Sequence, residues 1–284
     1  MTRRGKRVIW SLILVPAFIY LLICAVMFFA QTRLLLPVGQ VSAAGPLPAA
    51  AERLDIEAAS GERLRGLHIP PTRPEGEPLL IIGFGGNAWN SDAMAALLAD
   101  LYPQADIVTF HYRGFPPSEG SPGAAAMRAD APLVFDFTRA RFPGRRIVAI
   151  GFSIGSGVAA SLAAERPLDG LILVTAFDSL WRVAAAQFPW LPVRLLFSNN
   201  LDPAEDLAGR QIPVALLSAG RDGLVQPERT AALRGAIAPL MFDRTLPMAD
   251  HNSIYRDPGF DPAMREALAA VLAAGRRNPT SPRT

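Results

Sequence analysis

The stretch Gly151-Phe152-Ser153-Ile154-Gly155 decides the fold of this chain, because it holds the only serine with glycine two residues before and two residues after it. The apolar run 146–150 precedes it and predicts a buried strand, and the small residues over 157–164 predict a helix after it. In this context a G-x-S-x-G motif forms a sharp turn that pushes the serine hydroxyl out above the sheet edge. Glycine is needed on both sides because side chains there would collide with the strained turn.

Apolar strands and helical segments alternate on both sides of this turn. Strands are predicted over 78–82, 107–112, 146–150, 170–174, 212–217 and 241–246, and helices over 91–101, about 125–142, 228–236 and 262–274. Ser91 is the expected N-cap of the first of these helices. Two short strands within 51–70, joined by a turn at Ser60-Gly61, predict an antiparallel edge. The pattern predicts an α/β fold, with a mostly parallel sheet covered by helices on both faces.

The charge of the chain is concentrated at its two ends. The formal net charge is +3, yet residues 1–7 carry four Lys or Arg and residues 276–284 carry three Arg, with no acidic residue in either segment. The middle of the chain is therefore at about −4, which leaves no basic surface for nucleic acid. The single cysteine, Cys24, excludes a disulfide within the chain, and no Cys/His spacing suits a metal site.

The N-terminal segment predicts a membrane anchor. Residues 8–30 carry no charge and are long enough to span a bilayer, and the basic segment 1–7 before them predicts a cytoplasmic N-terminus. The catalytic domain would then lie on the periplasmic or extracellular side. A cleaved signal peptide is the alternative, although its apolar region is normally about 7–15 residues. We expect a Pro- and Gly-rich linker over 31–50, a globular domain over 51–275 and a flexible tail over 276–284.

A serine nucleophile needs a base, and the chain offers three histidines. His68 belongs to the early edge strand, and His111 ends a strand far from the expected site. His251 lies in the loop between the last strand and the last helix. Its place in the chain favours His251 as the base, although a solvated loop histidine is the plain alternative.

The base must be oriented by an acid, for which two aspartates compete. Asp222 directly follows the strand 212–217, and Ser153, Asp222 and His251 occur in the order Ser…Asp…His. Asp178 also follows a strand and could equally be a helix N-cap. We favour Asp222.

Two backbone N–H groups are candidates for stabilising an oxyanion. One belongs to Ile154, the residue after the nucleophile, and the other to Asn87 in the glycine-rich loop 83–88. The same loop matches the dinucleotide fingerprint G-x-G-x-x-A. The acidic residue expected about 20 residues later is missing, which argues against an oxidoreductase.

Taken together, these motifs resemble the α/β-hydrolase superfamily, particularly the membrane-anchored ABHD-type serine hydrolases, over residues 30–275. The resemblance is carried by these segments in order: Gly86-Asn87-Ala88, Tyr112-Arg113-Gly114, Ser118 to Pro122, Ser153, Asp222 with Val225-Gln226-Pro227, and His251-Asn252. It implies a Ser-His-Asp hydrolase that acts on esters, thioesters or amides without a cofactor. Two positions depart from the family: Gly85 stands where histidine is usual, and Trp89 replaces a small residue, which would alter the oxyanion loop or narrow the acyl pocket.

The segment 178–207 is expected to form a short cap. Its apolar residues, among them Trp181, Phe188 and Trp190, either cover the nucleophile and favour a lipid-like acyl substrate or simply pack on the sheet. The sequence therefore predicts a membrane-anchored esterase or lipase-like serine hydrolase for small or lipid-like acyl substrates. A peptidase of the serine aminopeptidase type and a non-catalytic, membrane-tethered binding protein are the alternatives.

Overall fold

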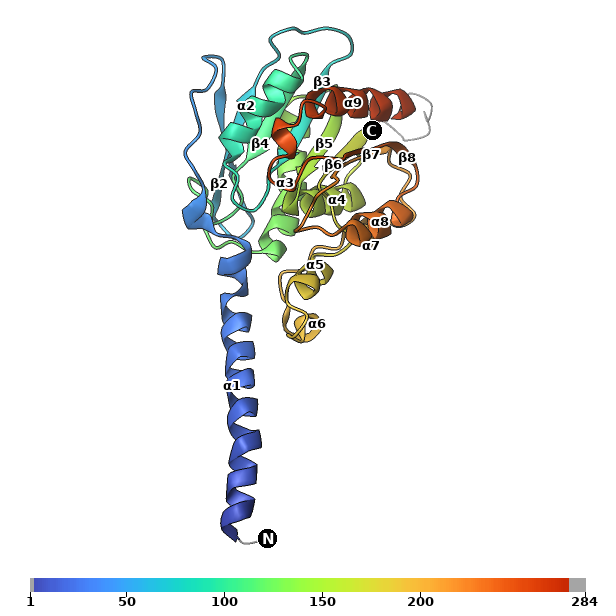
Figure 1. The fold of residues 1–284 in the computed structure, drawn as a ribbon. Coiled ribbons are helices and arrows are strands. Elements are labelled where there is room, and N and C mark those ends of the chain that lie inside the picture. Colours follow the sequence, from blue (N-terminus) through green and yellow to red (C-terminus); the bar gives the residue numbers. More distant parts are fainter. Residues whose placement is uncertain (1–2, 276–284) are drawn as a thin grey trace.

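The computed structural model describes residues 3–275, with side chains described from residue 10 onward. The predicted tail 276–284 lies outside the described residues, as do the first two residues of the predicted basic segment 1–7. Figure 1 shows a globular α/β domain from which one long helix, α1 (Arg3–Leu35), projects. A short 3-10 helix, η1 (Val38–Gln40), then leads toward the sheet.

The centre of the domain is an eight-stranded sheet in the order β1-β2-β4-β3-β5-β6-β7-β8. Its strands are β1 (Glu52–Glu57), β2 (Arg63–Ile69), β3 (Leu79–Phe84), β4 (Ala105–Phe110), β5 (Arg146–Phe152), β6 (Gly170–Val174), β7 (Val214–Ala219) and β8 (Leu240–Leu246). The strands from β4 to β8 in this order are parallel, and β1 and β2 form an antiparallel edge. The predicted mostly parallel sheet is confirmed.

Helices cover both faces of the sheet (Figure 1). One face carries α2 (Ser91–Leu101) and α9 (Phe260–Gly275), and the other carries α3 (Ala124–Arg141), α4 (Ile154–Glu165), α7 (Pro203–Leu207) and α8 (Pro227–Ala236). β3, β4, β6 and β7 are buried along their whole length, and their residues are accordingly apolar or glycine, with the exceptions of Asp106, Thr109 and Ser218. Two hydrophobic cores result, one on each side of the sheet.

The register of the central strands brings two loops together. Phe84, the last residue of β3, pairs with Gly151 of β5. The loop that follows β3 therefore lies beside the turn that follows β5, at the carboxyl edge of the sheet. In parallel α/β sheets this edge is where binding sites form.

The N-cap of α2 is Asn90, not Ser91 as predicted. The Asn90 side chain accepts hydrogen bonds from the N–H groups of Asp92 and Ala93, as a capping residue does. The Ser91 hydroxyl instead donates to the carbonyl oxygen of Phe110, 3.0 Å away. Both residue types can cap a helix, and the tertiary contact decides which of them does.

The helix α1 is longer than the predicted span. It is long and apolar enough to cross a membrane, and it tolerates Pro16 in its interior. Because it ends at Leu35, the first five residues of the predicted linker 31–50 are helical. Leu36, directly after the helix, is only 1% exposed and packs in the core of the domain. The C-terminal end of α1 is thus part of the globular domain.

Candidate active site

Ser153 occupies a strained turn between β5 and α4. Its backbone φ is 51°, in the left-handed region that residues other than glycine rarely adopt. A Cβ on Gly151 would collide with the Gly155 carbonyl, and a Cβ on Gly155 would collide with the Phe84 carbonyl. Both glycines are therefore required by backbone packing, which is the steric reason that the sequence predicted.

The structure brings Ser153, His251 and Asp222 into contact. The Ser153 Oγ lies 2.8 Å from His251 Nε2, and His251 Nδ1 lies 2.7 Å from Asp222 Oδ2. The three residues are far apart in the chain: the serine and the histidine are separated by 98 positions in sequence number. They meet because each follows a strand of the same sheet at its carboxyl edge.

Local hydrogen bonds orient the acid and the imidazole. Asp222 Oδ1 accepts from the N–H groups of Leu224 and Val225, at 2.9 and 2.7 Å, which leaves Oδ2 for the imidazole. The loop that carries His251 is held by Asp250, whose side chain accepts from two backbone N–H groups further along the loop. The hydrogen bond from the Ser253 amide is the main reason why the pKa of Asp250 lies below its ordinary value.

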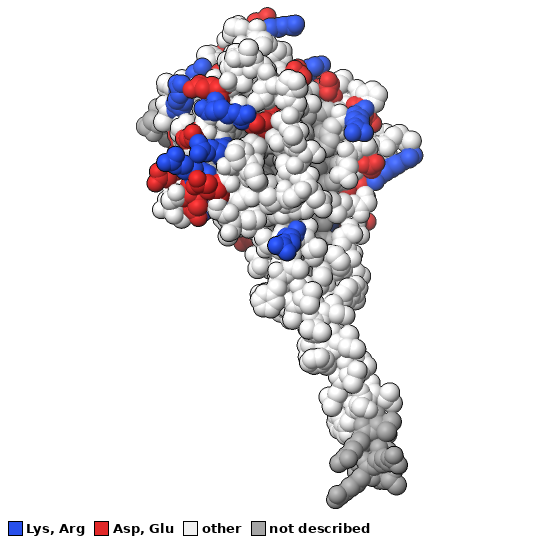
Figure 2. Space-filling view, turned by 90° about the vertical axis from the view of Figure 1, so that its left-hand side faces the viewer, with Lys and Arg blue, Asp and Glu red and all other residues white. Residues whose placement is uncertain are grey.

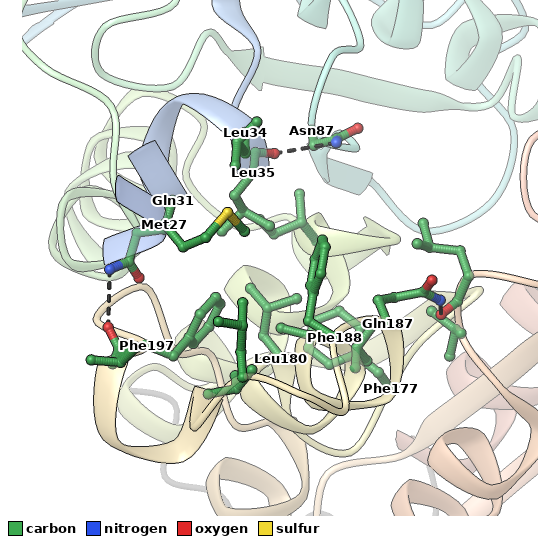
Figure 3. Close-up of a pocket in the computed structure, with 18 of the residues that line it drawn as sticks. Met27, Gln31, Leu34, Leu35, Asn87, Phe177, Leu180, Gln187, Phe188 and Phe197 are labelled. Atoms are coloured by element: carbon green, nitrogen blue, oxygen red, sulfur yellow. Dashed lines mark hydrogen bonds between the residues drawn. The ribbon is translucent and has the colours of Figure 1, made fainter. Parts of the chain in front are cut away.

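The glycine-rich loop after β3 lies against the nucleophile. A Cβ built on Gly86 would be 3.8 Å from the Ser153 Cβ, an ordinary contact distance. The Asn87 side-chain amide donates to the Leu35 carbonyl, 3.2 Å away, so it points to α1 rather than to the serine (Figure 3). Ile154 is the first residue of α4, where a backbone N–H has no carbonyl partner within the helix.

The sequence led us to expect that Trp89 would alter the oxyanion loop or narrow the acyl pocket. The structure shows no narrowing, because Trp89 is not among the residues that line the cavity. Its ring packs against Phe152, with centroids 5.1 Å apart, and against Tyr255, with centroids 4.8 Å apart. Phe152 precedes the nucleophile, and Tyr255 follows His251 by four residues. The indole therefore connects the glycine-rich loop, the serine turn and the histidine loop from the side away from the cavity.

An apolar cavity of about 390 Å³ opens next to Ser153 (Figure 3). Its walls come from three parts of the chain: α1, the loops that carry the site, and the cap formed by α5 (Leu180–Gln187) and α6 (Val193–Leu196). The predicted cap residues Phe188, Leu191, Leu196 and Phe197 line it. Trp181 and Trp190 do not. None of the described residues that line the cavity carries a charge.

The contribution of α1 to this cavity was not foreseen from the sequence. Met27, Phe28, Gln31, Leu34 and Leu35 all line it, at the spacing of one helix face. Gln31 donates to the Leu196 carbonyl at 3.0 Å and accepts from the Ser198 N–H at 2.8 Å. A polar residue at the end of an apolar run was the one signal in the sequence that this segment contacts the rest of the protein.

The other candidates from the sequence lie away from Ser153. His68 pairs with Asp106 at 2.7 Å, and His111 pairs with Asp92 at 3.1 Å. Asp178, the rival acid, forms an ion pair with Arg229 at 2.9 Å. Within the described side chains no group of three or more His, Cys, Asp or Glu is placed to hold a metal ion.

Comparison with known proteins agrees with this architecture. Residues 78–212 match the model of the alpha/beta hydrolase fold family. A Pyrococcus furiosus esterase superposes with a TM-score of 0.64 at 17% identity, covering 80% of this chain and 94% of that one. A lidless serine hydrolase of Xanthomonas campestris gives a TM-score of 0.56 at 19% identity, over 84% of this chain and all of that one. The chain belongs to the α/β-hydrolase family, and the resemblance found in the sequence is confirmed.

Two relatives are similar over long stretches of sequence. An uncharacterised protein of Mycobacterium tuberculosis is 30% identical over 218 residues, which cover 74% of this chain and 77% of the relative. The lysophosphatidylserine lipase ABHD12 of Macaca fascicularis is 28% identical over 190 residues. That match covers 57% of this chain and 48% of the lipase, so about half of the lipase lies outside the match. The relatives and solved neighbours support a hydrolase of the esterase or lipase kind.

Proposed function

We propose that this protein is a membrane-anchored serine hydrolase that cleaves carboxylic esters or thioesters through an acyl-enzyme. One observation carries the proposal: the hydrogen-bonded chain from Ser153 Oγ through the His251 imidazole to Asp222 Oδ2, with distances of 2.8 and 2.7 Å. This is the arrangement in which a serine hydroxyl becomes a nucleophile at neutral pH.

In the proposed mechanism, Ser153 Oγ attacks the carbonyl carbon while His251 Nε2 takes the hydroxyl proton. The oxyanion that forms accepts hydrogen bonds from the backbone N–H groups of Ile154 and Asn87. Asp222 keeps the proton on Nδ1 and stabilises the imidazolium. When the tetrahedral intermediate collapses, His251 gives its proton to the leaving alkoxide or thiolate. Water then attacks the acyl-enzyme, with His251 again as base, and the carboxylic acid leaves as Ser153 regains its proton.

The cavity favours acyl substrates over peptides. A peptidase that removes N-terminal residues needs an acidic group to receive the substrate ammonium, and the described lining residues include none. Apolar walls suit an acyl chain, because its burial is favourable at about 25 cal/mol per Å². The relative ABHD12 is named a lysophosphatidylserine lipase, which agrees with this substrate class.

We also propose the membrane arrangement. The helix α1 spans the bilayer with the N-terminus in the cytoplasm, because four basic residues precede the apolar run and only Arg33 follows it closely. The catalytic domain is then on the periplasmic or extracellular side. In this arrangement the strands of the hydrolase domain begin near residue 51, the C-terminal end of α1 packs against them, and 178–207 forms the cap.

The experiment is labelling of the full-length protein with a fluorophosphonate probe. Wild type is expected to react, and Ser153→Ala is expected to lose the label entirely. Ser161→Ala is the matched control: this serine lies on α4, is buried, and has no hydrogen-bond partner for its hydroxyl among the described residues, so its label should persist. A folded wild-type protein that stays unlabelled would favour the alternative of a non-catalytic, membrane-tethered binding protein.

A further inference from the structure

The cavity extends from the nucleophile along α1. Asn87, which lines the cavity with Ser153, bonds to the carbonyl of Leu35 near the end of the helix. Met27 lines the same cavity eight residues earlier, which is about 12 Å further along the helix axis. The Met27 side chain points into the cavity from the α1 side (Figure 3). The lining of the cavity therefore extends along α1 from Leu35 toward the N-terminal part of the helix.

The cap reaches down beside the apolar part of α1. The Tyr20 hydroxyl donates to the carbonyl oxygen of Trp190, 2.9 Å away, so this part of the cap lies at the level of Tyr20. If the hydrocarbon layer begins at Val8, its thickness of about 30 Å corresponds to about 20 residues and ends near Met27. Tyr20, and Trp190 with it, would then lie about 10 Å inside that layer.

The cap exposes large apolar side chains, as expected for a surface that lies inside the hydrocarbon layer. Leu195 is 84% exposed and Trp190 is 52% exposed, which is unfavourable in water. Figure 2 shows charged side chains gathered on the broad part of the domain, while the surface that tapers into α1 is almost free of charge. Arg182 and Arg194, the cap's cations, lie over the ring of Trp181 at 5.1 and 5.8 Å.

We propose that the cavity opens into the bilayer between α1 and the α5–α6 cap, and that the acyl chain of a membrane-resident ester lies along α1 with Met27 at its far end. This rests on the proposed hydrolase function and names the source of its substrate. An acyl chain that enters sideways passes from hydrocarbon to an apolar wall without crossing water, while its ester group meets Ser153 near the surface. Met27 is then a residue that sets chain-length specificity.

The test uses full-length protein in phosphatidylcholine nanodiscs and p-nitrophenyl esters from butyrate to palmitate. Met27→Trp fills the far end of the cavity, so kcat/KM for the long esters should fall at least about tenfold relative to butyrate. Met27→Ala should shift the preference toward longer chains. Val26→Trp is the control: its side chain is 56% exposed, is not among the lining residues and lies one position away on the same helix. Its chain-length profile should equal that of wild type.

Fluorophosphonate labelling separates the possible failures. If all three variants are labelled and share one chain-length profile, the placement of the acyl chain is wrong while the hydrolase proposal stands. If wild type is neither labelled nor active on any ester, both proposals are overturned. If Met27→Trp alone is unlabelled, that variant has misfolded. The test then depends on Met27→Ala: a chain-length preference shifted toward longer esters supports the placement of the acyl chain, and a wild-type preference overturns it.

Discussion

The side chain of Gln31, on α1, donates a hydrogen bond to the carbonyl oxygen of Leu196, on the cap, across 3.0 Å. The same side chain accepts from the Ser198 N–H, so one residue of the N-terminal helix satisfies two backbone groups of the cap. These residues are more than 160 positions apart in the chain. The helix and the cap are therefore fastened to each other by specific polar contacts as well as by apolar packing.

We expect Gln31→Leu to loosen the cap. Leucine has a similar volume but cannot pair with the two backbone groups, and each unpaired group costs about 1–3 kcal/mol if it stays buried. The melting temperature in nanodiscs should fall, and KM for long-chain esters should rise more than kcat falls. Gln40→Leu, an exposed position after α1, is the control and should behave as wild type. Unchanged melting and KM in Gln31→Leu would show that the contact is dispensable.

We expect Leu195→Asp to reduce stability in a membrane. In water, replacing an exposed leucine changes stability by about 0.5 kcal/mol or less, whereas an aspartate within the bilayer costs about 3 kcal/mol. Met241→Asp makes the same kind of change at a 37% exposed position on the edge strand β8, away from α1. Thermal unfolding of the two variants in nanodiscs should differ clearly, with Leu195→Asp the less stable. Equal melting temperatures would place the cap in water.

We expect Asp222→Asn to lower kcat by about 10⁴-fold, the effect typical of losing the acid of a triad. The amide oxygen can still accept from the Leu224 and Val225 N–H groups, so the loop should keep its shape. The amide nitrogen would face His251 Nδ1 and favour the wrong imidazole tautomer. Asp250→Asn is the control, because its amide oxygen can keep the two backbone bonds of the histidine loop. Ester hydrolysis by purified protein measures both, and near-normal kcat in Asp222→Asn would refute its assignment.

Asp178 gives a prediction about pH. Burial raises the pKa of its carboxyl above the ordinary 3.8, although the Arg229 guanidinium at 2.9 Å acts to lower it. The folded protein therefore binds a proton on the Asp178 carboxyl more tightly than the unfolded chain does. Protonation of Asp178 then stabilises the folded state: the effect is absent well above the folded-state pKa and grows as pH falls through that pKa. Wild type should therefore gain stability relative to Asp178→Asn as pH is lowered from neutral toward 4.

Asp136 is the matched control for this titration, with the opposite sign. The hydrogen bond from Arg166 holds the pKa of Asp136 below its ordinary value, so its contribution is lost as pH falls. Wild type should lose stability relative to Asp136→Asn over the acidic range. Melting temperatures recorded from neutral pH to about pH 3 measure both, because the Asp136 contribution is lost only as pH falls below the ordinary carboxyl pKa. Trends of the same sign in the two pairs would contradict the assignment for Asp178.

The sequence was sufficient for the parts of the fold that local patterns determine. The apolar strands and the steric demand for glycine at 151 and 155 were both readable from the chain. The meeting of Ser153, Asp222 and His251 followed from their positions just after strands, because parallel strands end at one edge of the sheet. Chain order therefore located these side chains without any distance information.

The sequence was not sufficient where long-range contacts decide. An apolar run gives no sign of which face of a helix contacts protein and which contacts lipid, so the cavity wall from α1 was missed. Trp89 was expected to alter the oxyanion loop or to narrow the acyl pocket. Its ring is not among the residues that line the cavity and packs on Phe152 and Tyr255 instead. Such a choice depends on the aromatic neighbours that folding supplies, and two of them come from distant segments.

The burial of Leu36, together with the α1 residues that wall the cavity, bears on how the protein should be prepared. A recombinant fragment started at residue 51, which would remove the apolar N-terminal helix, would lack Met27, Leu35 and Leu36. The cavity beside Ser153 would be open to buffer on one flank, and the Asn87 amide would have lost its carbonyl partner. Kinetic constants measured on such a fragment would describe a damaged enzyme, so purification should retain the whole N-terminal helix.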